Sequence, residues 1–326
     1  MAEQDFEIEN GVVVDYQGTD TDIVIPDGVC EIGDGVFWGS DIESVRLPSS
    51  VKAICSEAFM NCHELRTVEL PDSITRIEEE AFCNSGIRSI RLPARLKRIA
   101  EDCFSGSKLE EITLPDGVQK ICDHAFAYCS DLTRVVLPPA LKHIDSSAFA
   151  NCTKLRDINL PQATQVDGGV FDFCTSLMGG DGFVVVNGML FQSPAFSRFC
   201  EVTIPDRVRV IKYRSVNINP RDSDGMWFTS RQERWDAIEK KVGSVIRIPR
   251  SVEIIESGAF CGDITTIISE STAYFGCCAL SDCERLTKLV VPKGTEISES
   301  VFGFGDKAPK LRERLKIIYI DDAEMN

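Results

Sequence analysis

The 326-residue sequence has little of what marks a protein that binds nucleic acid or enters a membrane. No apolar run approaches the ~18 residues that a membrane-spanning helix needs. Positive charge is scarce, because 35 Lys and Arg stand against 51 Asp and Glu, for a net charge of −16. An acidic surface of this kind repels phosphate groups and anionic lipid. We therefore expect neither a nucleic-acid partner nor membrane insertion.

The N-terminal residues "MAEQDFEIENG" lack the apolar core of a signal peptide. As written, the sequence is therefore expected to be cytoplasmic, with the cell surface or secretion as the alternative if a leader has been removed. In a reducing compartment the 14 cysteines would be free thiols.

An internal repeat of 22 or 23 residues is the main feature that the sequence does have. A proline follows a branched aliphatic residue at Pro48, Pro71, Pro93, Pro115, Pro138 and Pro161. Wider steps of 44, 44 and 43 residues then lead to Pro205, Pro249 and Pro292. Read in one register, each unit runs Leu-x-x-Val-x-Leu-Pro-x-x-Val-x-x-Ile-x-x-x-Ala-Phe-x-x-Cys.

Each slot of this unit has a structural meaning. The alternation over residues 66–70 predicts a strand with Val68 and Leu70 on one side. Proline then ends the strand, because it cannot donate a ladder hydrogen bond. One unit cannot bury its own apolar face, so the units must stack on one another. Stacking would place six phenylalanines in one buried column: Phe59, Phe82, Phe104, Phe126, Phe149 and Phe171.

The 23-residue period and the Ala-Phe-x-x-Cys signature resemble the leucine-rich repeats of the BspA-like type. The resemblance covers residues 6–216 and returns over residues 245–302. It implies an α/β repeat solenoid, a right-handed superhelix with a parallel sheet on its concave side. Here it would have about twelve turns and one helical insertion. The resemblance further implies a protein of interaction or adhesion that is not an enzyme.

We expect a single solenoid over residues 1–326. The dipeptide Asn-Gly between apolar runs predicts a hairpin in "FEIENGVVV" and another in "FVVVNGMLF". The expected parts are a cap hairpin over 1–25, regular repeats over 26–180, a hairpin and repeat over 181–216, a helical insertion over 217–243, and degenerate repeats with a C-terminal cap over 244–326.

Most of the cysteines follow the repeat. One slot holds Cys62, Cys129, Cys152, Cys174 and Cys283, with Ser85 and Ser107 in the turns between. A slot that accepts serine needs a small side chain, so we interpret these thiols as core residues. Cys-x-x-Cys pairs for a metal are missing, and the three histidines fall in different slots, away from any Cys-His arrangement. We expect no catalysis, no cofactor and no metal, with a thiol-based enzyme or sensor as a remote alternative.

Two surfaces are candidates for binding. The outward strand slots form two columns on the predicted concave face, which include Arg46, Glu69, Arg91 and Arg134. They are either a solvated face with alternating charges or an extended surface for a partner.

The second candidate is the stretch 217–243, where the repeat pattern breaks. The segment "SRQERWDAIEKKVG" begins with a capping box and ends in glycine, which predicts a helix. Eleven basic and five acidic residues lie between Arg207 and Arg250. Tryptophan and arginine are typical of interface hot spots, so the candidate binding residues are Trp227, Arg231, Arg234 and Trp235. The alternative is a helix that only packs on the solenoid flank.

These observations predict a non-catalytic scaffold that binds a protein or peptide through the concave sheet or the basic insertion. The alternative is a cell-surface adhesin or carbohydrate-binding module.

Overall fold

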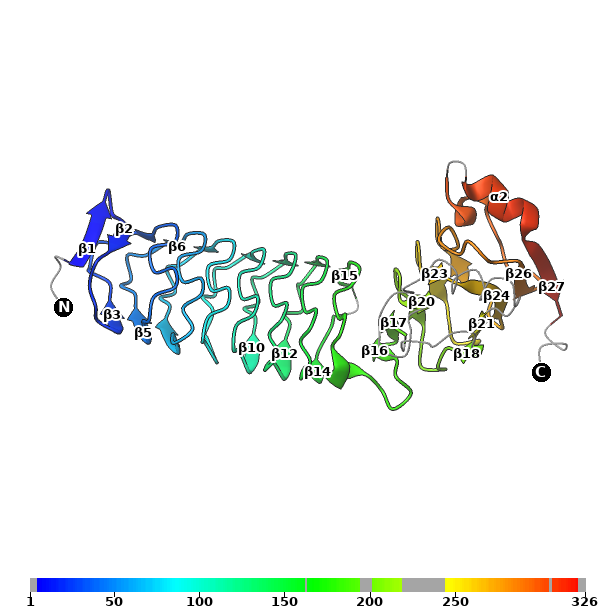
Figure 1. The fold of residues 1–326 in the computed structure, drawn as a ribbon, viewed down its shortest axis with the longest axis horizontal. Helices are drawn as coiled ribbons and strands as arrows, with labels where there is room; N and C mark the ends of the chain where they lie inside the picture. Colours follow the sequence, from blue (N-terminus) through cyan, green and yellow to red (C-terminus); the bar gives the residue numbers. More distant parts are fainter. Residues whose placement is uncertain (1–4, 162, 194–200, 219–243, 305–306, 322–326) are drawn as a thin grey trace, which may run out of the picture. The chain divides into compact units, whose positions relative to one another are not determined.

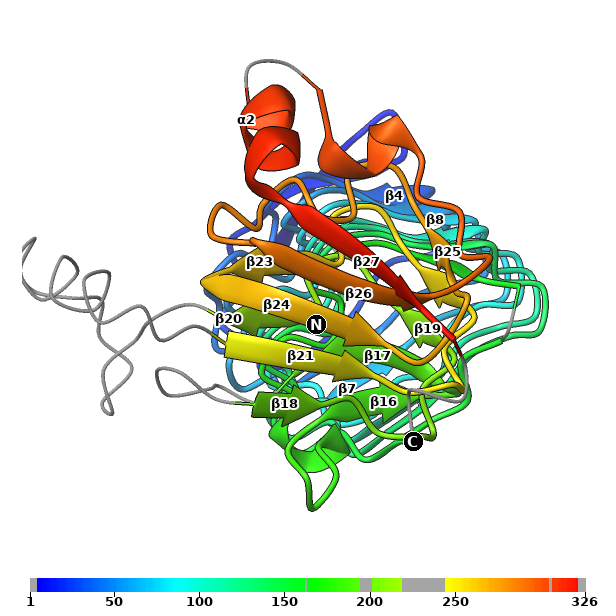
Figure 2. The same cartoon turned by 90° about the vertical axis from the view of Figure 1, so that its right-hand side faces the viewer.

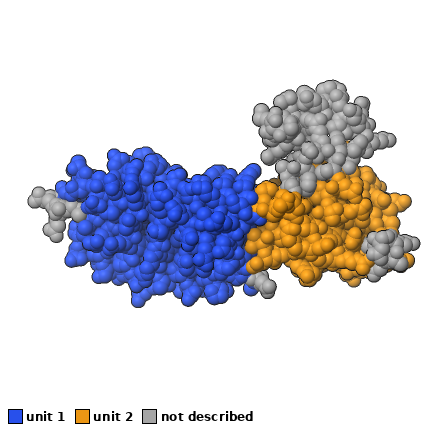
Figure 3. Space-filling model, turned by 90° about the horizontal axis from the view of Figure 1, so that it is seen from below, with its two compact units in different colours: residues 1–177 blue, residues 178–326 orange. Residues whose placement is uncertain are grey.

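The computed structural model describes residues 5–161, 163–193, 201–218, 244–304 and 307–321. The chain divides into two compact units, residues 1–177 and 178–326 (Figures 1 and 3). Both are built from stacked turns with parallel strands and little helix, about eleven turns against the twelve expected. The repeat-solenoid fold is thus confirmed. A single solenoid over 1–326 stays a prediction, and the expected helical insertion lies, beyond Ile218, outside the described residues.

Unit 1 opens with an antiparallel hairpin of β1 (Phe6–Glu9) and β2 (Val12–Tyr16). Its turn residues Asn10 and Gly11 have φ of 52° and 82°, as a tight hairpin turn requires. Strand β2 then pairs in parallel with β4 (Glu31–Ile32). The hairpin predicted from Asn-Gly is confirmed, and it caps one strand ladder of the unit.

The repeats of unit 1 form two strand ladders. The proline-containing side carries β3 (Asp22–Val24), β5 (Ser44–Arg46), β7 (Thr67–Glu69), β10 (Glu111–Thr113), β12 (Arg134–Val136) and β14 (Asp157–Ile158). We call this side the strand face. The second ladder has β4 (Glu31–Ile32), β6 (Ala53–Ile54), β8 (Arg76–Ile77), β9 (Arg98–Ile99), β11 (Lys120–Ile121), β13 (His143–Ile144) and β15 (Gln165–Val166). A 3-10 turn, η2 (Thr175–Leu177), follows the last repeat.

A column of stacked phenylalanine rings fills the corner between the two ladders. Neighbouring rings from Phe37 to Phe171 have centroids 5.2–5.9 Å apart and planes within 11° of parallel. Every ring is at most 1% exposed. The spacing follows from strands that lie ~4.8 Å apart. The predicted column is confirmed and begins one turn earlier, at Phe37.

The thiols of the repeated cysteine slot hydrogen-bond to this column. Cys152 donates from Sγ to the Phe126 carbonyl of the preceding turn at 3.1 Å, and Cys174 donates to the Phe149 carbonyl at 3.0 Å. Ser85 occupies the same slot, and its buried hydroxyl has no hydrogen-bond partner among the described residues. The slot therefore accepts small residues, as expected. A cysteine there donates a hydrogen bond to the phenylalanine carbonyl of the preceding turn, and Ser85 does not.

Unit 2 repeats the plan of unit 1, with a second hairpin first. Strands β16 (Val184–Val186) and β17 (Met189–Gln192) are antiparallel, and β17 continues in parallel into β19 (Val210–Ile211), β22 (Ile254–Ile255) and β25 (Tyr274–Phe275). The other ladder, which Figure 2 shows face on, has β18 (Glu201–Thr203), β21 (Ser244–Ile248), β24 (Ile264–Ser269), β26 (Lys288–Pro292) and β27 (Lys316–Ile320). The remaining elements are β20 (Val216–Ile218), β23 (Phe260–Gly262), η3 (Glu299–Phe302) and α2 (Lys307–Arg314).

Removing one ring from the phenylalanine column should strongly destabilise unit 1. We expect Phe126→Ala to lower the free energy of unfolding by about 3–5 kcal/mol, the usual effect for a buried aromatic side chain. Phe173 is 52% exposed, so Phe173→Ala should change it by about 0.5 kcal/mol or less. Urea unfolding of both variants measures the difference. Equal, small losses in the two variants would show that the column is not the core.

The buried thiols should be unreactive in the folded protein. Burial raises the pKa of Cys174 to about 12 and that of Cys83 to about 11, so neither forms much of the nucleophilic thiolate near pH 8. We expect a bulky thiol reagent to label few sites on the native chain and all 14 after denaturation without reductant. A shortfall after denaturation would reveal disulfides.

Candidate interaction groove on the strand face

Most of the charged strand-face residues pair with one another across neighbouring turns. Arg46 on β5 donates to both carboxylate oxygens of Glu69 on β7, with Nε–Oε2 at 2.9 Å and Nη2–Oε1 at 3.3 Å. Arg134 on β12 pairs with Asp157 on β14 at 3.0 Å. All four side chains are more than half exposed. At these positions the structure therefore supports the interpretation as a solvated face with alternating charges.

Arg91 occupies its expected slot, but no strand forms around it on the strand face. The strand-face ladder runs β3-β5-β7, stops, and resumes as β10-β12-β14. The second ladder also stops, at β8, and resumes at β9. The two breaks share the junction between residues 66–78 and residues 88–100, which we call the seam. The strand-face break extends to the following junction as well, because no strand forms between β7 and β10.

Four backbone hydrogen bonds that occur at other junctions of unit 1 are missing at the seam. Elsewhere Leu47 N–H donates to Glu69 O at 3.4 Å, and Cys122 N–H donates to Ile99 O at 3.0 Å. The equivalent amides at the seam donate to no backbone carbonyl of the described residues: Leu70, Arg88, Lys97 and Ala100. These backbone N–H groups therefore lack, at the seam, the carbonyl of the neighbouring turn with which their equivalents pair elsewhere in unit 1.

The corner beside the seam stays closed. Phe82 and Phe104 stack at 5.5 Å, and Phe82 N–H donates to Cys103 O at 2.9 Å. The two turns therefore meet at the phenylalanine column and part at the ladders.

Gly86 lies where this distortion begins. Its N–H donates to Cys62 O at 2.9 Å, and a Cβ at this position would lie 2.1 Å from the backbone oxygen of His63. Only glycine allows such a close approach. In the neighbouring turns the equivalent residues are His63 and Lys108, which have side chains. Gly86 is the signal in the sequence that marks this turn as different.

A groove of about 800 Å³ opens on the strand face at the seam. Its apolar lining includes Val68, Ile90 and Ile112. Val68 and Ile112 are buried, whereas Ile90, in the same slot of the open turn, is only half-buried. The polar lining includes Arg66, Ser89, Arg91, Glu111, Thr113 and Asp116.

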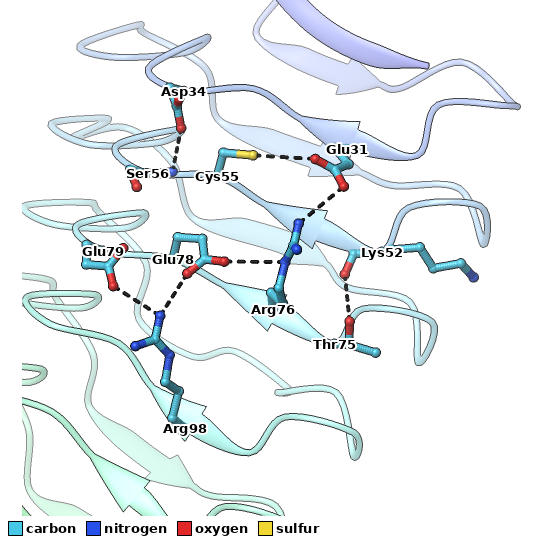
Figure 4. A network of polar contacts seen from close by, with 10 residues as sticks. All are labelled: Glu31, Asp34, Lys52, Cys55, Ser56, Thr75, Arg76, Glu78, Glu79 and Arg98. Atoms are coloured by element: carbon cyan, nitrogen blue, oxygen red, sulfur yellow. Dashed lines mark hydrogen bonds and ion pairs between the residues drawn. The ribbon is translucent and has the colours of Figure 1, made fainter. Parts of the chain in front are cut away.

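Ion pairs bridge the seam where backbone bonds do not. Arg98 on β9 reaches Glu78 at 2.9 Å and Glu79 at 3.1 Å, and Figure 4 shows it extended toward both carboxylates. On the strand face, Arg91 reaches Asp72 at 2.9 Å. Exposed pairs of this kind contribute little to stability, so they position the open turn without closing it.

The open turn is basic. Residues 86–100 contain no acidic residue and five basic ones: Arg88, Arg91, Arg95, Lys97 and Arg98. Arg95 and Lys97 are exposed and have no ion-pair partner within the described part of the chain. Within a protein of net charge −16, this turn supplies unneutralised positive charge beside the groove.

The other sequence candidates, Trp227, Arg231, Arg234 and Trp235, lie outside the described residues. Over the described ranges, no group of three or more His, Cys, Asp or Glu side chains is arranged to hold a metal ion. None of the helices described there has the length and apolarity to cross a membrane.

Parallel ladders, a 22- or 23-residue unit and a stacked phenylalanine corner define a leucine-rich-repeat solenoid. The sequence matches the BspA type leucine rich repeat region over residues 16–108, 52–178 and 240–322, and the chain belongs to this family. Proteins of this type generally serve in surface adhesion or as interaction scaffolds and typically are not enzymes.

Solved structures agree with this fold. A leucine rich repeat protein from T. pallidum is 31% identical, with 54% of this chain and 89% of that chain covered and a TM-score of 0.50. One from Bacteroides ovatus is 21% identical, with 97% of each chain covered and a TM-score of 0.52. No curated protein matches the sequence.

Adding a side chain at Gly86 should disturb the seam. We expect Gly86→Ala to destabilise unit 1 by about 1–3 kcal/mol, because the new methyl group meets backbone atoms that cannot rotate away. At Gly180 an added Cβ would meet no atom within 4 Å, so Gly180→Ala serves as the control and should be nearly neutral. Thermal unfolding measures both. A neutral Gly86→Ala would contradict the close approach.

Proposed function

We propose that the chain is a non-catalytic scaffold that binds an extended, acidic segment of a protein partner in the groove at the seam. The single observation that carries this proposal is the break in both ladders beside a turn with unpaired positive charge. Membership of a family of interaction and adhesion proteins supports the general class.

An extended peptide suits the open backbone. A strand that lacks a neighbour presents free N–H and C=O groups, and peptides bind such groups by adding a strand. Leu47 and Leu114 donate their backbone N–H groups to a carbonyl of the next turn. Leu70 and Leu92 occupy the same slot but make no such bond within the described residues, so their N–H groups could pair with a peptide. Alternate side chains of the peptide would meet the apolar surface around Ile90.

The basic turn selects the charge of the peptide. Arg95 and Lys97 are exposed and without ion pairs in the described structure, so acidic side chains would gain contacts there without breaking existing ones. Such exposed charges mainly accelerate association and fix orientation, and their effect weakens with salt. The acidic remainder of the protein disfavours approach elsewhere.

A charge-reversed pair of peptides tests the proposal. The probes are two labelled eight-residue peptides, one alternating Glu and Val and the other alternating Lys and Val, with binding followed by fluorescence anisotropy. We expect the acidic peptide to bind and the basic one not to. Arg95→Glu with Lys97→Glu should weaken binding about tenfold, equivalent to ~1.4 kcal/mol.

The matched control reverses two exposed lysines on another sheet. Lys288→Glu with Lys316→Glu makes the same change in net charge on the sheet of unit 2 and should leave binding unchanged. Equal effects of the two double variants would mean that only overall charge matters, which contradicts the groove as the site.

The stretch 217–243 is the second candidate surface, because it holds two tryptophans and lies within residues 207–250, where eleven basic residues stand against five acidic ones. Arg231→Glu with Arg234→Glu separates the two candidates when partner proteins are recovered on the immobilised chain. Recovery lost only in this variant favours the insertion, and recovery lost only in the Arg95 and Lys97 variant favours the groove. Trp235→Ala completes the set, since an anchoring tryptophan should be required for recovery without affecting the melting temperature.

Cell-surface adhesion, through a carbohydrate or another surface ligand, is the alternative function that the family supports.

A further inference from the structure

Most of the described turns round their corner through a residue with left-handed backbone conformation. Among these residues are Glu57, Glu80, Asp102, His124, Ser147, Arg214 and Cys278, with φ between 48° and 59°. The residues immediately before them are Ser56, Glu79, Glu101, Asp123, Ser146, Tyr213 and Cys277. Polar or charged side chains dominate this corner, and among the described turns only the one at 277–278 places two thiols there. The repeat that explains Cys283 does not explain this pair.

The two thiols of this corner are in contact. The Sγ atoms of Cys277 and Cys278 lie 3.4 Å apart, well beyond the ~2.05 Å of a disulfide bond. Both side chains are half-buried, whereas most of the other described cysteines are buried. Cys30 is exposed, and Cys55 and Cys261 are half-buried, but the sulfur contacts of these three within the described residues are to oxygen atoms and not to a second thiol. Cys277 and Cys278 therefore form an accessible vicinal dithiol.

The backbone holds this dithiol in place. Cys278 N–H donates to Ser300 O of the following turn at 2.7 Å. Its carbonyl accepts from the Gly258 N–H of the preceding turn at 3.2 Å and from the Ser281 hydroxyl at 3.0 Å. Because both neighbouring turns fix Cys278, the two sulfur atoms are positioned before any ligand arrives.

We propose that Cys277 and Cys278 form a binding site for a thiophilic centre that takes two sulfur ligands, of which an organic trivalent arsenical is the clearest example. Bonds of about 2.3 Å from sulfur to one such centre span sulfur atoms up to ~4.6 Å apart, so the observed 3.4 Å needs no large movement. The reaction is a condensation without redox change. Two S–As bonds form, the arsenic–oxygen double bond of the oxide breaks, and both thiol protons leave with its oxygen as one water.

The local chemistry favours a two-sulfur centre over zinc. Structural zinc takes four ligands, and the described residues contain no cluster of three or more potential ligands. Burial, followed by the neighbouring Cys277 thiol, raises the pKa of Cys278. Cys278 is therefore a thiol near neutral pH, the form that the condensation consumes.

Phenylarsine oxide is the test probe, with intact-mass measurement on the folded full-length chain. We expect one adduct per chain that survives an excess of a monothiol and is released by the dithiol 2,3-dimercaptopropanol. Cys277→Ser and Cys278→Ser should each abolish the monothiol-resistant adduct. Cys30→Ser removes an exposed but isolated thiol and should retain it. Peptide mapping locates the modified segment.

Two results would overturn the site. One is a monothiol-resistant adduct that persists in the Cys277→Ser variant, and the other is a wild-type adduct that the monothiol removes. Circular dichroism of each variant checks that the fold is kept, and both serine variants are expected to pass, because serine fills this corner in other turns at Ser146 and Ser147.

Discussion

Contact between one turn and the next is the interaction on which every other feature of this chain depends. A single turn has too little apolar surface to be stable alone, so the fold exists only as a stack. Two kinds of contact hold the stack together in unit 1: the phenylalanine corner and the two strand ladders. The seam shows that they are separable, because the Phe82–Phe104 stack continues where the ladders stop. The corner is therefore the continuous element of the unit, and the ladders can open locally without ending it.

Much of the fold could be predicted because a residue at a given slot of the repeat has the same structural role in every turn. The Ala-Phe pairs predicted the buried column, and the two Asn-Gly dipeptides predicted both hairpins. Phe37 was missed because Val36 precedes it instead of alanine, although the ring occupies the same position. The break at the seam was missed because Ile90, Arg91 and Leu92 fit the strand template. The sequence pattern predicts which side chains face the core, but it does not predict whether a backbone hydrogen bond forms between two neighbouring turns.

The candidate site was harder to predict for a related reason. Sequence columns suggested Arg46, Glu69 and Arg134 as a binding surface, yet register places Arg46 opposite Glu69 and the two neutralise each other. Whether a charge is paired depends on the residue one turn away, and the reach of each side chain decides the outcome. Arg91, for example, pairs with Asp72, 19 residues earlier and not a full period away. Arg95 and Lys97 emerged as unpaired only once these geometries were known.

An unpaired strand edge can bind a partner but can also cause aggregation, and the charges at the seam bear on both. Unpaired edges invite the same edge of another copy, which leads to aggregation, and proteins commonly protect them with lysine or arginine. Here Arg95 and Lys97 have no ion-pair partner in the described part of the chain, so these charges would disfavour pairing of two copies of the groove. Each missing ladder bond forgoes about 1 kcal/mol of net stability, and the uninterrupted corner stack makes that loss tolerable. Positive charge at an open edge thus disfavours pairing with the same edge of another copy and, under the proposed function, suits an acidic chain. The same residues that protect the seam would give it specificity.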